Sequence, residues 1–381
     1  MGDYRMERLG IFVFYDNAGI LDSYFAYLLS AFSPFCQEII IAVNGEIEQD
    51  SLKRLKSYSN HVLIRANIGF DAGAYKDIFQ TYFPLIQEKG FDEVILLNDT
   101  FYGPLYPLKE ILECFDEKTA DFWGITRHPE GIWPDGKRFP EHIQSYFFAV
   151  KKRMLYSEAF WKFWKDMRYP ADIREAIDEF EIRFTTYFTE KGFTGKAVTD
   201  LKAVNIPLEN GESPYLYQSF QLIREMRVPF LKRNSLSLAN EGYVNTLAAL
   251  RYVERNLDYD VEMIWKNIIR LSRDGRFSRK INYLELEKFY GCHDRVFIYG
   301  TGRYGRNIAA YFRYREWVNS GFIVSDGRSS GEDGVFTFSD IGWRKEDGII
   351  VAMGQKSFQE VYPEIMKRMN PSQVMLMQYS S

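Results

Sequence analysis

The feature that most restricts the fold of this chain is the alternation, over its first 130 residues, of short apolar runs with stretches of helical periodicity. The apolar runs, which we predict to be strands, are Leu9–Tyr15, Glu38–Val43, Val62–Arg65, Glu93–Leu97 and Asp121–Thr126. The helices predicted between them are Ile20–Phe32, Gln49–Tyr58 and Ala74–Lys89. Strands that alternate with helices indicate a parallel sheet with helical crossovers. Runs that are apolar throughout indicate strands covered on both faces.

The rest of the chain predicts two further parts. Residues 145–240 are less regular, and the elements predicted there are a strand at Ser145–Lys151 and helices at Ser157–Met167 and Asp172–Lys191. Residues 241–293 are mostly helical in pattern, and we interpret them as a connector. Strands of a small Rossmann-like domain are predicted at Arg295–Tyr299, Phe322–Val324, Gly348–Ala352 and Gln373–Met377. We therefore expect domains at 1–240 and 294–381, joined by the connector 241–293.

Composition restricts the class of protein. A chain of 381 residues with 46% hydrophobic and 26% charged residues is typical of a globular protein with a sizeable core. The net charge of −4, with acids and bases interspersed, excludes the basic stripe that nucleic acid requires. Aromatic residues make up 17% of the chain, and we expect some of them to line a sugar-binding surface.

The cysteines and the apolar runs predict a location. Cys36, Cys114 and Cys292 are far apart and lack C-x-x-C spacing, so we expect buried free thiols in a reducing compartment. No signal-peptide pattern and no window of about 18 apolar residues is present. We expect a cytoplasmic protein that contacts the inner face of the membrane through an aromatic patch.

Polar residues follow three of the predicted strands, at the sheet edge where open α/β proteins bind ligands. Asn44 follows the second strand, the loop Asn67–Tyr75 follows the third, and Asn98-Asp99 follows the fourth. In that loop, glycine at 69 and 73 permits close backbone approach, while Asn67 and Asp71 can hold ribose or base edges. The alternative interpretation is an ordinary capped turn.

Asp99 is the candidate metal ligand. In a nucleotide-sugar transferase, an acid directly after such a strand holds Mn²⁺ or Mg²⁺, which bridges the diphosphate and stabilises its charge as it leaves. The alternative is that Asp99 only begins the turn into Tyr102.

Glu179 and Glu181 are the candidate bases. An inverting transferase needs one carboxylate to take the proton from the attacking hydroxyl, and both glutamates lie in a helical stretch rich in acids. A solvated charged helix face is the alternative. Trp123 could stack on a sugar, and His142, two residues before Gln144, could contact phosphate or metal; purely structural roles are the alternative for these residues.

Several of these segments together resemble one family. The runs VNG, RANIGFDAGAYKD, EVILLNDTFYGPL, DFWGIT, HIQSYFFAVKK, AFWKFW and FEIRFTTYFTEKGF occur in this order over about residues 9–235. They resemble the rhamnan synthesis F family of bacterial polysaccharide-assembly enzymes. The resemblance implies a GT-A-type fold, a nucleoside-diphosphate sugar donor, and a role in building cell-surface polysaccharide that contains rhamnose or a related sugar.

The resemblance also implies residue roles. It places Asn44 at the nucleobase, and it places Asn67, Gly69, Asp71 and Asn98 with the donor. Asp99 takes the place of the D-x-D metal motif, and Glu179 or Glu181 that of the base. Trp123, His142 and Gln144 complete the expected donor site. This chain has Asn-Asp-Thr instead of D-x-D, which leaves one acid instead of two.

A glycine pattern marks the C-terminal domain. Gly300-x-Gly302-x-x-Gly305 follows a predicted strand and opens a helix, and Asp326 follows the next strand, as a nucleotide-binding fingerprint requires. A structural or partner-docking module is the alternative.

We therefore expect an inverting glycosyltransferase that acts on a glycan or polyprenyl-linked acceptor. An NAD(P)-dependent sugar-nucleotide oxidoreductase and a non-catalytic scaffold of a polysaccharide assembly complex are the rival hypotheses.

Overall fold

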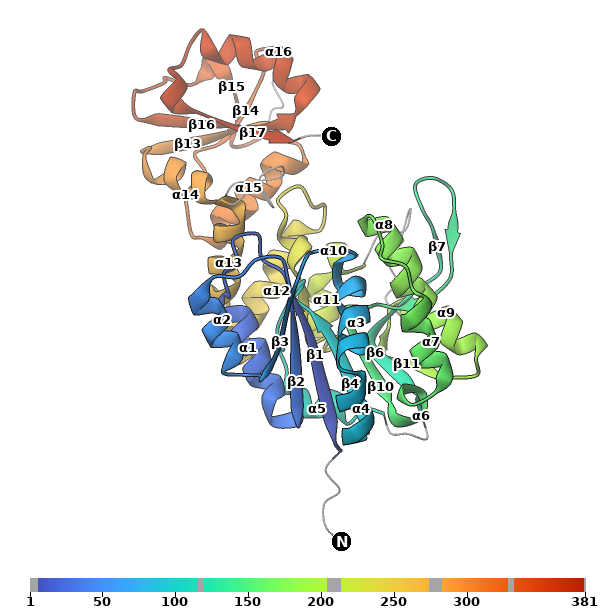
Figure 1. Cartoon of the computed structure of the whole chain (residues 1–381). Coiled ribbons are helices and arrows are strands. Elements are labelled where there is room, and N and C mark those ends of the chain that lie inside the picture. The colour runs from blue at the N-terminus through green and yellow to red at the C-terminus, as the bar shows by residue number, and fades with distance from the viewer. Residues whose placement is uncertain (1–5, 116–118, 204–213, 274–282, 328–331, 380–381) are drawn as a thin grey trace. The chain divides into compact units, whose positions relative to one another are not determined.

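The computed structural model describes residues 6–115, 119–203, 214–273, 283–327 and 332–379 (Figure 1). The chain forms two compact units, the first made of Met1–Pro214, Leu222–Arg233 and Leu257–Tyr259, and the second of Tyr215–Gln221, Asn234–Asn256 and Asp260–Ser381. Each unit contains a sheet with helices, so the predicted α/β class is confirmed. The three-part division stays a prediction.

The sheet of the first unit has the strand order β11-β6-β10-β4-β1-β2-β3. Its strands are β1 (Arg8–Phe14), β2 (Glu38–Asn44), β3 (His61–Arg65), β4 (Glu93–Asn98), β6 (Phe122–His128), β10 (Phe147–Lys151) and β11 (Gly195–Asp200). The strands β1 to β4 are parallel, and β10 is antiparallel to both of its neighbours, β4 and β6. The register pairs Ile11 with Ile40 on one side and with Leu96 on the other. The sheet is thus mainly parallel at its centre, as the alternation of strands and helices predicts.

Short strands extend this framework: β5 (Phe101–Tyr102) pairs with β12 (Leu231–Lys232), and β9 (His142–Ile143) pairs with β6. A hairpin is formed by β7 (Gly131–Ile132) and β8 (Arg138–Phe139). The main helices are α1 (Ser23–Phe32), α2 (Gln49–Lys56), α3 (Phe70–Thr81), α4 (Phe83–Lys89), α5 (Leu108–Leu112), α6 (Lys152–Leu155), α7 (Glu158–Asp166), α8 (Ile173–Ala176) and α9 (Arg183–Glu190).

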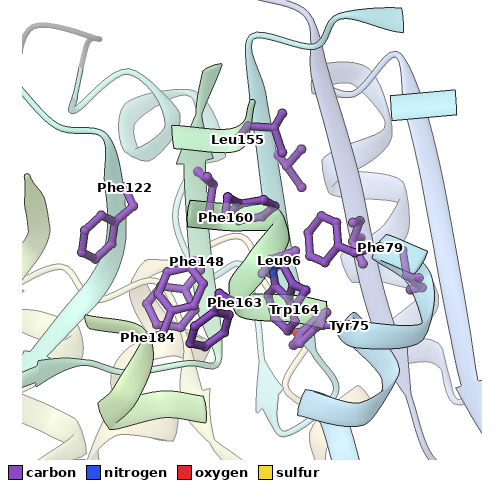
Figure 2. Close-up of a cluster of buried hydrophobic side chains, with 14 of the residues drawn as sticks. Tyr75, Phe79, Leu96, Phe122, Phe148, Leu155, Phe160, Phe163, Trp164 and Phe184 are labelled. Carbon is purple, nitrogen blue, oxygen red and sulfur yellow. The ribbon is translucent and has the colours of Figure 1, made fainter. Parts of the chain in front are cut away.

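Both faces are buried at the centre of the sheet, which explains why β1 and β4 are largely apolar, whereas the edge strands β3 and β11 are only partly buried. Leu9, Ile11 and Val13 of β1 face a core built with α3, α7 and α9. Figure 2 shows how the aromatic side chains of these helices gather against the strands. On the opposite face, Phe12 packs edge-on against Phe32 of α1, with ring centroids 5.5 Å apart.

Two helices differ from their predicted form. The stretch predicted as one helix at Ala74–Lys89 breaks at Tyr82, because Pro84 cannot donate the backbone hydrogen bond that a continuous helix needs. The stretch at Asp172–Lys191 is helical throughout but contains a π-helical segment, Ile177–Ile182, between α8 and α9. It ends before Gly192, which has a positive φ of 82°.

The cysteine expectation was half right. All three thiols are free, but Cys114 and Cys292 are exposed and Cys36 is only partly buried. Within the described ranges, no helix combines the length and the apolar character needed to cross a membrane.

The second unit contains a five-stranded sheet in the order β15-β14-β13-β16-β17, with every pair parallel. Its strands are β13 (Arg295–Tyr299), β14 (Phe322–Val324), β15 (Val335–Thr337), β16 (Asp347–Gly354) and β17 (Val374–Tyr379). Its longer helices are α12 (Tyr243–Asn256), α13 (Glu262–Arg273), α14 (Tyr283–Gly291), α15 (Arg303–Tyr314) and α16 (Gln355–Met366). In sequence order the strands run 3-2-1-4-5, as in the doubly wound nucleotide-binding fold.

Candidate active site

The carboxyl ends of β1 and β4 mark the point in the first sheet where the strand order reverses. The chain after β1 leads to β2 and β3 on one side, whereas β4 and the later strands lie on the other side. Open α/β sheets bind ligands at such a reversal, in the crevice between diverging loops. The backbone N–H of Tyr15, just after β1, donates to Oδ2 of Asp99, just after β4, over 3.4 Å. Asp99 therefore lies at the expected position for a ligand site.

Asn44, the expected nucleobase contact, is held by its neighbours at the end of β2. Its Oδ1 accepts from Nη1 of Arg65 over 2.5 Å, and its Nδ2 donates to the carbonyl of Phe70 over 3.3 Å. Arg65 also donates to the carbonyl of Ile68 and to Oδ2 of Asp77. Asn44 thus ties the ends of β2 and β3 to the loop before α3.

The loop before α3 has an unusual backbone. Gly69 and Phe70 both have positive φ, 74° and 54°, and a bulky residue rarely adopts this conformation without a local reason. A Cβ on Gly69 would come within 3.0 Å of the Tyr169 ring, so glycine here makes room for a side chain of the same protein. Asn67, the expected donor contact in this loop, is exposed.

Asp71 and Asn98 lie together, as the sequence predicts for residues of one sheet edge. Nδ2 of Asn98 donates to Oδ2 of Asp71 over 2.8 Å. Oδ1 of Asn98 accepts from both the backbone N–H and the hydroxyl of Thr100, over 3.1 and 2.6 Å. The amide oxygen of Asn98 therefore accepts its hydrogen bonds from Thr100, within the same turn.

Asp99 forms a buried ion pair. Oδ2 of Asp99 lies 3.5 Å from Nη2 of Arg233, and the two side chains are 2% and 6% exposed. Arg233 also donates to the hydroxyl of Tyr24, which in turn donates to the backbone carbonyl of Asp99. Burial alone would lower the pKa of Arg233, but Tyr24 and Asp99 outweigh it and raise that pKa. The negative charge of Asp99 is balanced within the protein.

These contacts do not suit a divalent cation. Asp99 is the single acid of the Asn-Asp-Thr turn, and the guanidinium of Arg233 lies beside the oxygen it would offer. A divalent cation about 5 Å from that guanidinium would be repelled by roughly 7 kcal/mol at an effective dielectric constant of about 20. Among the described residues, no three His, Cys, Asp or Glu side chains form a group that could hold a metal ion.

Glu181 is the better placed of the two candidate bases. Its Oε2 accepts from the backbone N–H and the hydroxyl of Ser145 over 2.7 and 2.5 Å, and its Oε1 lies 3.3 Å from Nε2 of His142. The π-helical segment Ile177–Ile182 sets the direction of this side chain, and such segments are frequent at functional sites. The structure thus brings Glu181 and His142 together.

The surroundings of Glu181 keep it ionised. Burial alone would raise its pKa, but the hydrogen bond and charge of His142 and the two hydrogen bonds from Ser145 lower the pKa to about 2. Nδ1 of His142 lies 3.0 Å from the carbonyl of Pro140, which orients the ring. The ring of His128 stacks on that of His142 at a centroid distance of 5.2 Å. Glu181 is therefore a fixed, ionised carboxylate, and its lowered pKa makes it a weaker proton acceptor than an ordinary glutamate.

Three other predicted site residues lie elsewhere or have other partners. Trp123 is 0% exposed and donates from Nε1 to Oε1 of Glu93, so its position in the core does not support stacking on a sugar. Glu179 forms ion pairs with Arg183 and Arg168 at the surface. Gln144 is buried, and its Oε1 accepts from the hydroxyl of Thr126.

Sequence reasoning missed the basic residues of the site. Arg65 is the last residue of β3, a position at the sheet edge that could have drawn attention to it. Lys232 and Arg233 have no such local signal, because they reach the turn after β4 only through the pairing of β12 with β5. Strand pairing between distant segments cannot be deduced from local periodicity.

The glycine loop of the second unit has the close packing that its pattern requires. A Cβ on Gly305 would lie 1.9 Å from the carbonyl oxygen of Gly300, which has a φ of 110°. A Cβ on Gly302 would meet no atom within 4 Å. Gly305 is thus explained by packing of α15 on the end of β13, and Gly300 by its positive φ and by the carbonyl of Ala352 in β16, while the backbone at Gly302 is open.

Asp326, the residue expected at a ribose, is engaged by protein groups. It accepts from the backbone N–H and the hydroxyl of Ser339 and from Nη1 of Arg368, over 3.0, 2.7 and 3.0 Å. A hollow of about 900 Å³ lies beside α15, and its lining includes Arg303, Arg306 and Arg313. Nucleotide binding by this unit stays a prediction.

Comparison with known proteins gives one curated relative, the uncharacterized protein y4gN of Sinorhizobium fredii (strain NBRC 101917 / NGR234). It is 26% identical over 188 residues, which are 49% of this chain and 46% of the relative. The match thus spans about half the length of the curated relative.

Two solved structures are similar to parts of this chain at low identity. The 4-diphosphocytidyl-2C-methyl-D-erythritol synthase of Anaerococcus prevotii is 12% identical, with a TM-score of 0.34, over 51% of this chain and 89% of that one. The glucosyl-3-phosphoglycerate synthase of Mycobacterium tuberculosis is 13% identical, with a TM-score of 0.26, over 39% of this chain and 58% of that one.

The sequence match to a family is more extensive. The family model for Rhamnan synthesis protein F matches residues 39–302, which is more than half of the chain and includes Glu181, Asp99 and the loop before α3. The resemblance stated from the sequence is confirmed: this chain belongs to the rhamnan synthesis protein F family.

Proposed function

We propose that this protein is an inverting glycosyltransferase. It would move a sugar from a nucleoside-diphosphate sugar to a hydroxyl of a glycan or lipid-linked glycan, in the synthesis of cell-surface polysaccharide that contains rhamnose or a related sugar. Membership of the rhamnan synthesis protein F family supports the polysaccharide role. The polar edge of the first sheet, where the chain leaves β1 and β4 toward opposite sides, supports a nucleotide-sugar site.

The observation that carries the proposal is the arrangement around Glu181. In the proposed reaction the acceptor oxygen attacks the anomeric carbon, and the bond from that carbon to the diphosphate breaks. The electron pair of that bond leaves with the nucleoside diphosphate, and the proton of the hydroxyl goes to Glu181. Ser145 and His142 hold this carboxylate in one orientation, and it is this fixed position that supports its role as the base, because the same contacts lower its pKa.

Glu179 provides a matched control for this assignment. It lies two residues away in the same π-helical segment, but it is paired with Arg183 and Arg168 and is 31% exposed in its side chain. The two glutamates thus differ in their contacts and not in their chemical nature.

The test is transfer of a labelled sugar from a panel of nucleoside-diphosphate sugars into the lipid and glycan fractions of bacterial membranes. Glu181→Gln should lower the transfer rate by about 10²–10⁴-fold, the usual contribution of a general base. Glu179→Gln should keep most of the activity, and both variants should keep the circular dichroism spectrum of the wild type. Equal activity of the two variants would remove the assignment of Glu181.

A further inference from the structure

Two cationic side chains reach the candidate site from a segment far along the chain. The strand β12 pairs with β5 in register, Lys232 opposite Phe101, and the backbone N–H of Arg233 donates to the carbonyl of Thr100 over 3.0 Å. The pairing fixes the backbone of Lys232 and Arg233 beside the turn that carries Asp99. No sequence motif predicts this arrangement.

The side chains of Arg233 and Lys232 contact different neighbours. Arg233 is buried against Asp99 and Tyr24, as described above. Lys232 is partly exposed, and its Nζ lies 5.9 Å from the centre of the Phe101 ring. Burial lowers the pKa of Lys232, while the charge of Glu181 acts in the opposite direction. Successive side chains of a strand point to opposite faces, which separates the two environments.

A departing diphosphate needs positive charge, and the turn after β4 does not offer the ligands that a divalent cation needs. The oxygen of Asn98 is used by Thr100, and Asp99 is paired with Arg233. Lys232, half-buried on the strand that pairs with Phe101, brings a second positive charge to the turn after β4. Fixed cations stabilise charge that develops on a leaving group, as a metal does.

We propose that Lys232 and Arg233 take the place of a divalent cation in this protein. This inference rests on the proposed function. Lys232 contacts the diphosphate of the donor and stabilises the charge that the breaking bond leaves on it. Arg233 is a positioning residue that neutralises Asp99, so that the carboxylate neither repels the diphosphate nor recruits a metal. Donor binding is then independent of Mg²⁺ and Mn²⁺.

The first experiment measures the binding of nucleoside diphosphates to the purified full-length protein by calorimetry, with EDTA and with added Mg²⁺ or Mn²⁺. Wild-type protein should bind one nucleoside diphosphate with the same affinity in all three conditions. Lys232→Met should lower the affinity roughly tenfold or more, because it removes a charge-assisted contact, and Lys232→Arg should restore most of it. The matched control is Lys53→Met on the exposed face of α2, which should bind as the wild type does.

A second pair of variants tests Arg233 and guards against a simple loss of folding. Arg233→Met leaves Asp99 unpaired, so binding should weaken in EDTA and recover when Mg²⁺ is added. Removing both charges in Asp99→Asn/Arg233→Met should restore metal-independent binding. A merely structural arginine would not produce this response to metal.

The outcomes separate the two hypotheses. If no nucleoside diphosphate binds under any condition, the proposed function fails and this inference fails with it. If wild-type protein binds only when metal is added, the proposed function stands and the cation pair is refuted. Metal-independent binding that Lys232→Met leaves unchanged would also refute the role of Lys232.

Discussion

Glu181 shows how contacts from a distant segment define a functional side chain. Ser145 and His142, which hold it, come 36 or more residues earlier in the chain, from the segment around β9. They lower its pKa against the effect of burial. Glu179, with the same side chain and two residues away, lies in surface ion pairs instead. At this scale the candidate base is selected by its hydrogen-bond donors.

The lowered pKa predicts how stability depends on pH. Because the pKa of Glu181 falls from an ordinary 4.5 to about 2 in the folded state, its ionised form stabilises the fold above pH 4.5. This stabilisation is lost as the pH falls from 4.5 toward 2, and linkage puts it on the order of 3 kcal/mol. Urea unfolding of Glu181→Gln between these two pH values should therefore show a weaker dependence on pH than the wild type. An unchanged dependence would mean that Glu181 has an ordinary pKa.

The three glycines of the loop between β13 and α15 have different structural roles. Gly300 and Gly305 permit the helix to start close to the end of its strand, because the added Cβ at 305 would lie 1.9 Å from a backbone oxygen. Gly302, in the same loop, has open space around it and a φ of −70°, which any residue can adopt. The three glycines of one motif thus have different physical reasons.

Substitution by alanine should separate these reasons. Gly305→Ala should lower the free energy of unfolding by about 1–3 kcal/mol or more, because backbone must move to make room for the methyl group. Gly302→Ala should be neutral or stabilise by about 0.4–1 kcal/mol, because it only restricts the unfolded chain. Thermal unfolding of the two variants checks both expectations. Equal destabilisation by both would mean that the loop is packed differently.

The whole molecule consists of two units, each with its own parallel strands, and only the first contains the candidate active site. A ligand that binds a folded unit stabilises that unit by mass action, by about 2.7 kcal/mol at a concentration 100 times its dissociation constant. In calorimetric unfolding, a bound nucleoside diphosphate should therefore raise the unfolding temperature of the first unit. The Gly305→Ala substitution should lower the unfolding temperature of the second unit and leave that of the first unit unchanged. A ligand effect that disappears in Gly305→Ala would place the binding in the second unit.

Local patterns were sufficient for much of the fold. The apolar runs predicted β1 to β4, β6, β10 and most strands of the second unit to within a few residues, because a strand buried on both faces must be apolar along its length. The strand β11 was missed, because it lies at the sheet edge and its sequence, GKAVTD, is largely polar. The helix break at Tyr82 and the π-helical segment Ile177–Ile182 depend on backbone geometry that periodicity does not resolve.

The sequence by itself also determined which loops meet at one sheet edge, because parallel strands bring their carboxyl ends together. Asp71, Asn98 and Asp99 follow from that rule and from the family motifs. Only the tertiary structure decided that Asp99 pairs with Arg233, 134 residues away, and that Trp123 is buried in the core. The physical reason is that hydrophobic periodicity specifies which face of an element is buried. It does not specify which charged groups from distant segments meet there, and this decides the electrostatics of the site.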